Sequence, residues 1–178
     1  MLKLQIGSNV WKKAGWINID IDPSVNPDLV LDVRQGLPYQ DNSIDYIFME
    51  HFFEHINQQE SQKLLHECYR ALKSGGVIRI SGPDLQKLAK LYLSGNFELW
   101  KSRSGAPGET ICDFMNDVFY NWEHRYIPDP DQLTYMLRKA NFKRISRCEF
   151  RISDFEELKN LEIREQSQNE DSVVEGIK

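Results

Sequence analysis

The sequence contains few cysteines and no long apolar run. Its three cysteines, Cys68, Cys112 and Cys148, lie far apart and form no CxxC pair. This spacing argues against a disulfide framework or a zinc knuckle and indicates a reducing compartment. No stretch of about 18 apolar residues is present to cross a bilayer, and the apolar run at the N-terminus is too short for a secretory signal. We therefore expect a cytoplasmic chain without a membrane span.

An excess of positive charge is also lacking. The 178 residues include 22 Lys and Arg against 27 Asp and Glu, which gives a formal net charge of −5. Proteins that bind the phosphate backbone of nucleic acids do so mainly through clustered basic side chains. Nucleic acid is therefore not the expected partner. The length and a hydrophobic fraction of 40% suit one globular domain over residues 1–178.

Short segments of β type alternate with helical ones along the chain. Val77 to Ile80 follows a segment from Asn57 to Leu72 in which apolar residues recur at helical spacing, and Gly75 and Gly76 are expected to end that helix. Strand 44–49, this helix and strand 77–80 predict a parallel βαβ unit. The other predicted strands are 2–6, 16–21, 29–33, 142–150 and 172–177, and the other predicted helices are 85–93 and 131–140. This order predicts an α/β fold whose mostly parallel sheet carries an antiparallel edge hairpin.

The segment from Asp41 to Pro83 carries the most specific signal. It has an acidic turn, a strand, a loop with Glu54-His55, a helix, the turn LKSGG and a further strand, and in this order it resembles the second half of a class I S-adenosylmethionine-dependent methyltransferase. The strings GWINIDI, DLVLDVR and LPYQDNSID are similar to a bacterial, type-11-like subgroup of that family, whose members often look like partners of surface-polysaccharide enzymes. The resemblance covers nearly the whole chain. It implies a Rossmann-like fold and methyl transfer to a small-molecule or glycan acceptor.

The resemblance also implies a cofactor site at the carboxyl ends of the first strands, where open α/β sheets bind ligands. Gly7 permits close approach to the amino-acid end of S-adenosylmethionine. Asp20 is placed to accept two hydrogen bonds from the ribose, and Asp32 with the backbone of Val33 is placed to meet the adenine. The loop at Glu50 and His51 is expected to border the methionine part and the methyl group. The expected cofactor-binding residues are Gly7, Ser8, Asn9, Asp20, Asp32, Val33, Glu50 and His51.

The first turn departs from the glycine-rich GxGxG pattern of the family. It reads Gly7-Ser8-Asn9, and the gap from Ile6 to Trp16 is too short for the full helix that normally follows. We therefore predict that the first helix is short or missing. Asn9 adopts a left-handed conformation more readily than most residues, which would preserve the turn. A catalytically silent relative that serves as a binding or regulatory partner of another enzyme is an alternative function.

His51 and His124 are the candidate catalytic residues. His124 follows an aromatic stretch within residues 94–128, which we predict to be an acceptor-side insertion, and near neutral pH it can remove a proton from an acceptor hydroxyl. The same aromatics are equally typical of a small satellite core that closes the domain. Methyl transfer to a good nucleophile needs mainly alignment, so the reaction does not require a base.

The motif His51-Phe52-Phe53-Glu54-His55 gives a different alternative. HxxEH is the inverzincin zinc motif, and two histidines four residues apart on a helix can bind zinc, which would make the protein a metal-dependent hydrolase. However, the motif directly follows a predicted strand, and no third ligand is marked. The sequence therefore favours a protein without a metal site, in which His55 packs against or caps the next helix.

Overall fold

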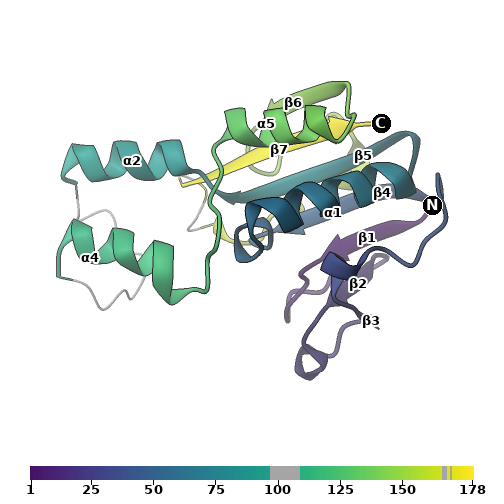
Figure 1. Ribbon diagram of the computed structural model, residues 1–178, viewed down its shortest axis with the longest axis horizontal. Coiled ribbons are helices and arrows are strands. Elements are labelled where there is room, and N and C mark those ends of the chain that lie inside the picture. The colour runs from purple at the N-terminus through teal and green to yellow at the C-terminus, as the bar shows by residue number, and fades with distance from the viewer. Residues whose placement is uncertain (97–108, 166–167, 169) are drawn as a thin grey trace.

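The computed structural model describes residues 1–96, 109–165, 168 and 170–178. Over this part of the chain, seven strands form one sheet in the order β3-β2-β1-β4-β5-β7-β6 (Figure 1). The strands are β1 (Lys3–Ile6), β2 (Ile17–Asp20), β3 (Leu29–Val30), β4 (Ile44–Glu50), β5 (Leu72–Pro83), β6 (Arg144–Cys148) and β7 (Asp171–Ile177). The α/β fold class predicted from the sequence is confirmed.

Four α-helices lie in the described ranges, with several shorter helical turns. They are α1 (Gln58–Ala71), α2 (Leu85–Ser94), α4 (Ile111–Asn116) and α5 (Pro130–Lys139). Helices α1 and α5 cover one face of the sheet, and α2 and α4 lie together beyond the end of the sheet, away from both chain termini (Figure 1). None of the described helices has the length and apolar character needed to span a bilayer.

The predicted βαβ unit is confirmed, because β4 and β5 pair in parallel and α1 connects them. Asn57 caps α1, and its side chain accepts from the amides of Gln59 and Glu60. The helix ends at Ala71, before the glycines that were expected to stop it. Leu72 already pairs with Ile44 of β4, and the amide of Gly75 donates to the carbonyl of Lys178. The backbone therefore enters the sheet directly after α1.

The predicted antiparallel edge is also confirmed. Strand β7 pairs antiparallel with both β5 and β6, while the other neighbours in the sheet are parallel. Strand β3 is shorter than the predicted strand 29–33. It ends at Val30 because Asp32 accepts a hydrogen bond from the amide of Arg34 and caps a 3-10 turn, η2 (Val33–Gln35).

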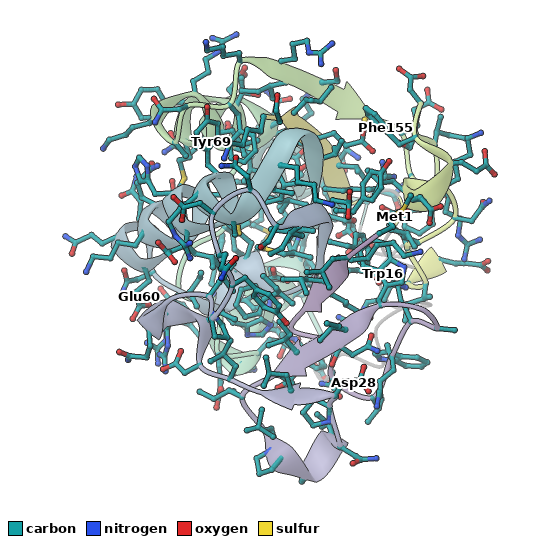
Figure 2. The ribbon with its side chains drawn as sticks, turned by 90° about the vertical axis from the view of Figure 1, so that its right-hand side faces the viewer. Met1, Trp16, Asp28, Glu60, Tyr69 and Phe155 are labelled. Carbon is teal, nitrogen blue, oxygen red and sulfur yellow. The ribbon has the colours of Figure 1, made fainter. Side chains whose placement is uncertain are left out.

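The two faces of the sheet are covered differently. Apolar side chains of α1 and α5 pack on one face against alternate strand residues such as Ile47 and Ile78. On the other face, Trp16, Phe48 and Val77 pack against Leu158 and Leu161 of the C-terminal segment. Figure 2 shows this arrangement, with Tyr69 and Glu60 of α1 on one side of the sheet and Trp16 and Phe155 on the other. A loop layer thus covers the second face.

An ion-paired cluster holds that loop layer in place. Arg79 of β5 is 0% exposed, and its guanidinium lies 2.6 Å from a carboxylate oxygen of Glu162 and 2.6 Å from one of Glu175. The same guanidinium donates to the carbonyls of Ile152 and Glu149. The cluster joins the centre of the sheet to residues 149–162 and fixes the course of the chain toward Arg164.

The connection between β1 and β2 contains no helix. The prediction that the first helix is short or missing is therefore confirmed. Asn9 has φ 45°, as expected for a residue that preserves the turn in a left-handed conformation. The amides of Gly7 and Ser8 both donate to the carbonyl of Ile19, at 2.9 and 3.0 Å. The turn is held against β2 by the backbone itself.

Candidate functional site

A cavity of about 400 Å³ opens at the carboxyl ends of β1, β2, β3 and β4. This is the edge at which parallel α/β sheets bind ligands. The lining combines strand-end residues with residues from two later segments of the chain. The lining residues are Ile6, Gly7, Asn9, Ile19, Asp20, Ile21, Leu31, Asp32, Val33, Arg34, His51, Phe52, His55, Ile56, Glu123, Arg125 and Arg164.

Gly7 lies where β1 enters the cavity, and only glycine fits there. Its φ is +69°, which is costly for residues with a side chain. A Cβ at this position would lie 2.5 Å from Cδ2 and 2.7 Å from Cβ of Phe52, well inside van der Waals contact. The glycine therefore permits both the turn and the position of Phe52, which forms part of the cavity wall.

Asp20 ends β2 and presents its carboxylate to the cavity. Oδ2 accepts from the amide of Asn9 at 2.7 Å, and Oδ1 accepts from the amide of Asp22 at 3.1 Å. Each carboxylate oxygen has two acceptor sites, so one remains on each oxygen. The two backbone bonds fix the carboxylate, and the remaining sites can accept a pair of neighbouring hydroxyls.

Asp32 lies on the cavity wall after β3, but Arg34 occupies its carboxylate. The Arg34 guanidinium donates through Nε to Oδ1 at 2.7 Å and through a terminal nitrogen to Oδ2 at 3.0 Å. The hydrogen bonds from Arg34 hold the pKa of Asp32 below its ordinary value. Asp32 is thus an ionised, preoriented part of the wall, next to the backbone of Val33.

His51 follows β4 in a left-handed conformation, with φ 49°. Its Nδ1 lies 3.1 Å from Oε1 of Glu54, and its Nε2 lies 2.7 Å from Oδ2 of Asp171. Burial alone would lower the pKa of His51, but the charges and hydrogen bonds of Asp171 and Glu54 raise it from about 6.5 to about 10. An imidazolium donates from both ring nitrogens, so His51 acts as a cation and not as a base.

We expect this cation to make stability depend on pH. Because the folded-state pKa of His51 lies above the unfolded one, its contribution is complete below pH ~6.5 and is lost as the pH rises toward ~10. Urea unfolding between pH 6 and 10 should show a fall in the free energy of unfolding that His51→Asn lacks, since asparagine tolerates the positive φ and does not titrate. Parallel pH profiles for wild type and variant would contradict the assignment.

Three residues predicted for the site lie outside the cavity lining. Ser8 is buried, and its hydroxyl has no partner among the described residues. Glu50 points to the opposite face, where Oε1 accepts from the amides of Ile163 and Arg164. His124 points inward: its Nδ1 lies 2.6 Å from the carbonyl of Val118. Glu50 thus positions the segment that supplies Arg164, while Ser8 and His124 form no part of the wall.

The aromatic stretch divides into two parts. Phe114 and Val118 belong to a small core with Leu88 and Ile127, which is the satellite core considered from the sequence. Glu123 and Arg125 line the cavity. The stretch therefore supplies two charged residues to the cavity wall, while Phe114 of α4 packs in the small core with Leu88 of α2.

The HxxEH motif does not form the zinc site that its sequence suggests. Residues Phe53–His55 form a 3-10 turn, η3, and the left-handed conformation of His51 places it outside any helix. Both ring nitrogens of His51 are bound to carboxylates, so it has no lone pair for a metal. The spacing of His51 and His55 therefore does not support a metal-dependent hydrolase.

Several residues of the wall were not predicted. Arg34 ends the motif DLVLDVR, and Phe52 and His55 belong to the motif HFFEH. Because they lie close in sequence to predicted site residues, they could have been predicted as part of the wall. Arg125 lies within the segment 94–128 that was expected on the acceptor side, whereas Arg164 had no such signal, because it reaches the cavity from a segment distant in sequence from the strand ends. Together with Arg34, they make three arginines in the cavity lining.

The comparisons with known proteins agree with this geometry. Residues 13–80 match the model of the methyltransferase domain family. No curated protein matches the sequence. Among solved structures, a SAM-dependent methyltransferase from Archaeoglobus fulgidus is similar at 19% identity with a TM-score of 0.65, over 99% of this chain and 85% of that one.

Two further structures connect this fold to named reactions of other proteins. A possible histamine N-methyltransferase from Thermotoga maritima is similar at 16% identity and a TM-score of 0.62, over 99% of this chain and 82% of that one. A phosphoethanolamine N-methyltransferase from Haemonchus contortus, in complex with phosphomonomethylethanolamine and S-adenosylhomocysteine, has 14% identity and a TM-score of 0.63. This chain spans 48% of that protein, with 100% of its own length covered. Residues 13–80 thus match the methyltransferase domain family, and the described residues have the fold of the solved SAM-dependent methyltransferases.

Proposed function

We propose that the chain binds S-adenosylmethionine in the cavity at the strand ends and transfers its methyl group to a small-molecule acceptor. The single observation that carries this proposal is the cavity lined by Gly7, Asp20, Asp32 and His51, which lie at or within two residues of the carboxyl ends of neighbouring parallel strands. The family implies the cofactor, which supplies an electrophilic methyl group. The residues present fit it, because they offer close backbone approach, a fixed carboxylate and positive charge.

Asp20 is the proposed partner of the ribose. Its two oxygens are fixed by the amides of Asn9 and Asp22, and their remaining acceptor sites suit the two hydroxyls. Val33 and the Asp32–Arg34 pair are the proposed border of the adenine. Arg164 and Arg125 are the proposed source of positive charge for the carboxylate of the methionine part, because charge-assisted hydrogen bonds to guanidinium groups are strong.

The proposed acceptor side lies over Glu123 and Arg125. We propose that the chain is one domain over residues 1–178 and that residues 94–128 form an acceptor-side insertion, of which residues 97–108 lie outside the described part. Two similar structures have names that refer to N-methylation of small amines, which supports a small-molecule acceptor. From the resemblance of the sequence, a glycan hydroxyl in surface-polysaccharide biosynthesis is our second proposal for the acceptor, and it would need a base other than His51 and His124.

Alignment of the two reactants is the proposed source of the rate enhancement. Holding a nucleophile and an electrophile in line contributes several kcal/mol to catalysis without proton transfer, on the order of 7–11 kcal/mol in favourable cases. His51 is a buried cation, and His124 is not among the residues that line the cavity. Neither is placed to accept a proton from an acceptor in the cavity, so we propose an acceptor that is already nucleophilic at neutral pH.

Calorimetric titration with S-adenosylmethionine and S-adenosylhomocysteine tests the cofactor site. We expect micromolar binding of both to wild type, and binding weaker by about 2–3 kcal/mol, roughly 30- to 150-fold, for Asp20→Ala. The reason is the loss of an ionised acceptor for two hydroxyls. Asp20→Asn retains one acceptor oxygen and should give an intermediate affinity.

Asp22→Ala is the matched control, because this carboxylate is exposed, lies two residues away and binds Ser24 instead of lining the cavity. It should bind the cofactor like wild type. Thermal unfolding of the three variants separates binding from folding, since Asp20 also holds the amide of Asn9. Wild-type affinity in a folded Asp20→Ala protein would refute the proposed ribose site.

A silent member of the same family is the second candidate, and the absence of a helix between β1 and β2 favours it. A helix N-terminus at that turn would supply amide donors and a partial positive charge, which this turn lacks. The same titration distinguishes the two functions. If neither S-adenosylmethionine nor S-adenosylhomocysteine binds to folded wild-type protein, a role as a binding partner replaces the enzymatic one.

A further inference from the structure

Two histidines and a glutamate converge beside the cavity, in an arrangement that the sequence did not indicate. Glu54 and His55 belong to η3, and His124 comes from the distant segment after η4 (Asp117–Asn121). One ligand atom from each of the three residues lies within 4.8 Å of the other two. We propose that Glu54, His55 and His124 bind one divalent transition-metal ion, preferably Zn²⁺.

The orientation of His124 prepares one nitrogen to bind a metal. Its Nδ1 lies 2.6 Å from the carbonyl oxygen of Val118, so Nδ1 carries the hydrogen and Nε2 keeps its lone pair. A hydrogen bond from the second ring nitrogen to a backbone carbonyl is the usual support of a metal-binding histidine. Nε2 lies 3.9 Å from Oε1 of Glu54.

Glu54 supplies the negatively charged ligand of the proposed metal site. Its side chain is 1% exposed, and Oε2 has no hydrogen-bond partner among the described residues. A buried ionised carboxylate with unfilled acceptor sites is costly unless a cation compensates it. Oε1, which accepts from His51, is the oxygen that faces Nε2 of His124. The carboxylate therefore offers a cation Oε2 or the second lone pair of Oε1.

The three ligand atoms, which all lie within 4.8 Å of one another, must move closer together to bind one ion. Zn–N and Zn–O bonds of about 2.0–2.2 Å in a tetrahedron place neighbouring ligand atoms roughly 3.4 Å apart. The separation of 3.9 Å between His124 and Glu54 is about 0.5 Å wider. The rings of His55 and His124 meet edge to face, with centroids 4.9 Å apart and an interplanar angle of 73°, so the two imidazoles are already in contact.

The ion would join η3 to the segment that carries Glu123 and Arg125. Three protein ligands leave a fourth position for water or a substrate atom, and His55 lies on the cavity wall. The ion would thus organise the acceptor side of the cavity. This inference does not depend on cofactor binding, because metal binding is measured by itself.

Protein purified without a histidine tag and stripped with a chelator would be titrated with Co²⁺ and with Zn²⁺. We expect one equivalent of either ion, visible absorption bands of low-coordinate Co²⁺ that Zn²⁺ displaces, and a higher thermal midpoint with Zn²⁺. His55→Ala and His124→Ala should each weaken binding by at least 100-fold, because each removes one of three ligands. His66→Ala is the control, since His66 is exposed on α1 and should leave binding unchanged.

Circular dichroism of each stripped variant establishes that it is folded. If His124→Ala does not fold, His124→Gln keeps a hydrogen-bonding side chain of similar length and is expected to weaken Co²⁺ binding similarly. The proposal is overturned if wild type binds neither ion stoichiometrically. It is also overturned if folded His55 and His124 variants bind Co²⁺ as tightly as the His66 variant.

Discussion

Arg79→Met should lower the free energy of unfolding by about 3–5 kcal/mol, the range measured when one partner of a buried ion pair is removed. Arg79 is fully buried and binds Glu162 and Glu175 through two contacts of 2.6 Å. Without the guanidinium, two carboxylates and the carbonyls of Glu149 and Ile152 lose their donor. Urea denaturation monitored by fluorescence measures the change.

Arg147→Met is the matched control. Arg147 lies on the edge strand β6, and its ion pair with Asp131 is exposed to solvent. Such pairs contribute roughly 0–1 kcal/mol. A triple variant, Arg79→Met with Glu162→Gln and Glu175→Gln, should recover part of the stability because it removes the uncompensated charges. Equal losses for the two single arginine variants would show that the buried cluster has no special role.

Gly7→Ala should abolish measurable binding of S-adenosylmethionine and destabilise the chain. The left-handed backbone conformation alone costs an alanine about 1–2 kcal/mol. In addition, the new Cβ would lie 2.5–2.8 Å from atoms of Phe52, and the nearest of these include Cβ of Phe52, which a rotation of the ring cannot move away. Phe52 must therefore shift within the wall of the cavity. Calorimetry with the cofactor and thermal unfolding measure the two effects.

Gly75→Ala separates backbone strain from the clash. Gly75 has φ +80°, and a Cβ there would meet no atom within 4 Å, so this variant should lose stability but keep its cofactor affinity. Gly7→Ala combined with Phe52→Ala should recover part of the affinity, since the added methyl group would then have space. Cofactor binding by Gly7→Ala within threefold of wild type would contradict the role assigned to this close approach.

Local sequence patterns were sufficient to predict the order of the main strands and helices along the chain. The capping side chain of Asn57 and the helical spacing of Leu64, Leu65 and Cys68 predicted α1 within a few residues. The boundaries that failed were those where distant partners decided the structure. The prediction that Gly75 and Gly76 end this helix was wrong, because Leu72 already pairs with Ile44 in the sheet. No residue next to Leu72 in sequence indicates that pairing.

The sequence by itself determined which side chains stand at the strand ends: Gly7, Asp20, Asp32 and His51 are placed there by short-range backbone preferences and by the alternation of the strands. Only the tertiary structure decided what these residues can do. His51 is a cation because Asp171 lies 2.7 Å from its Nε2 across 120 positions of sequence. Arg125 and Arg164 reach the cavity, and His124 meets His55, through contacts between segments far apart in the chain. Charge and proximity depend on distance in space, which a linear pattern does not contain.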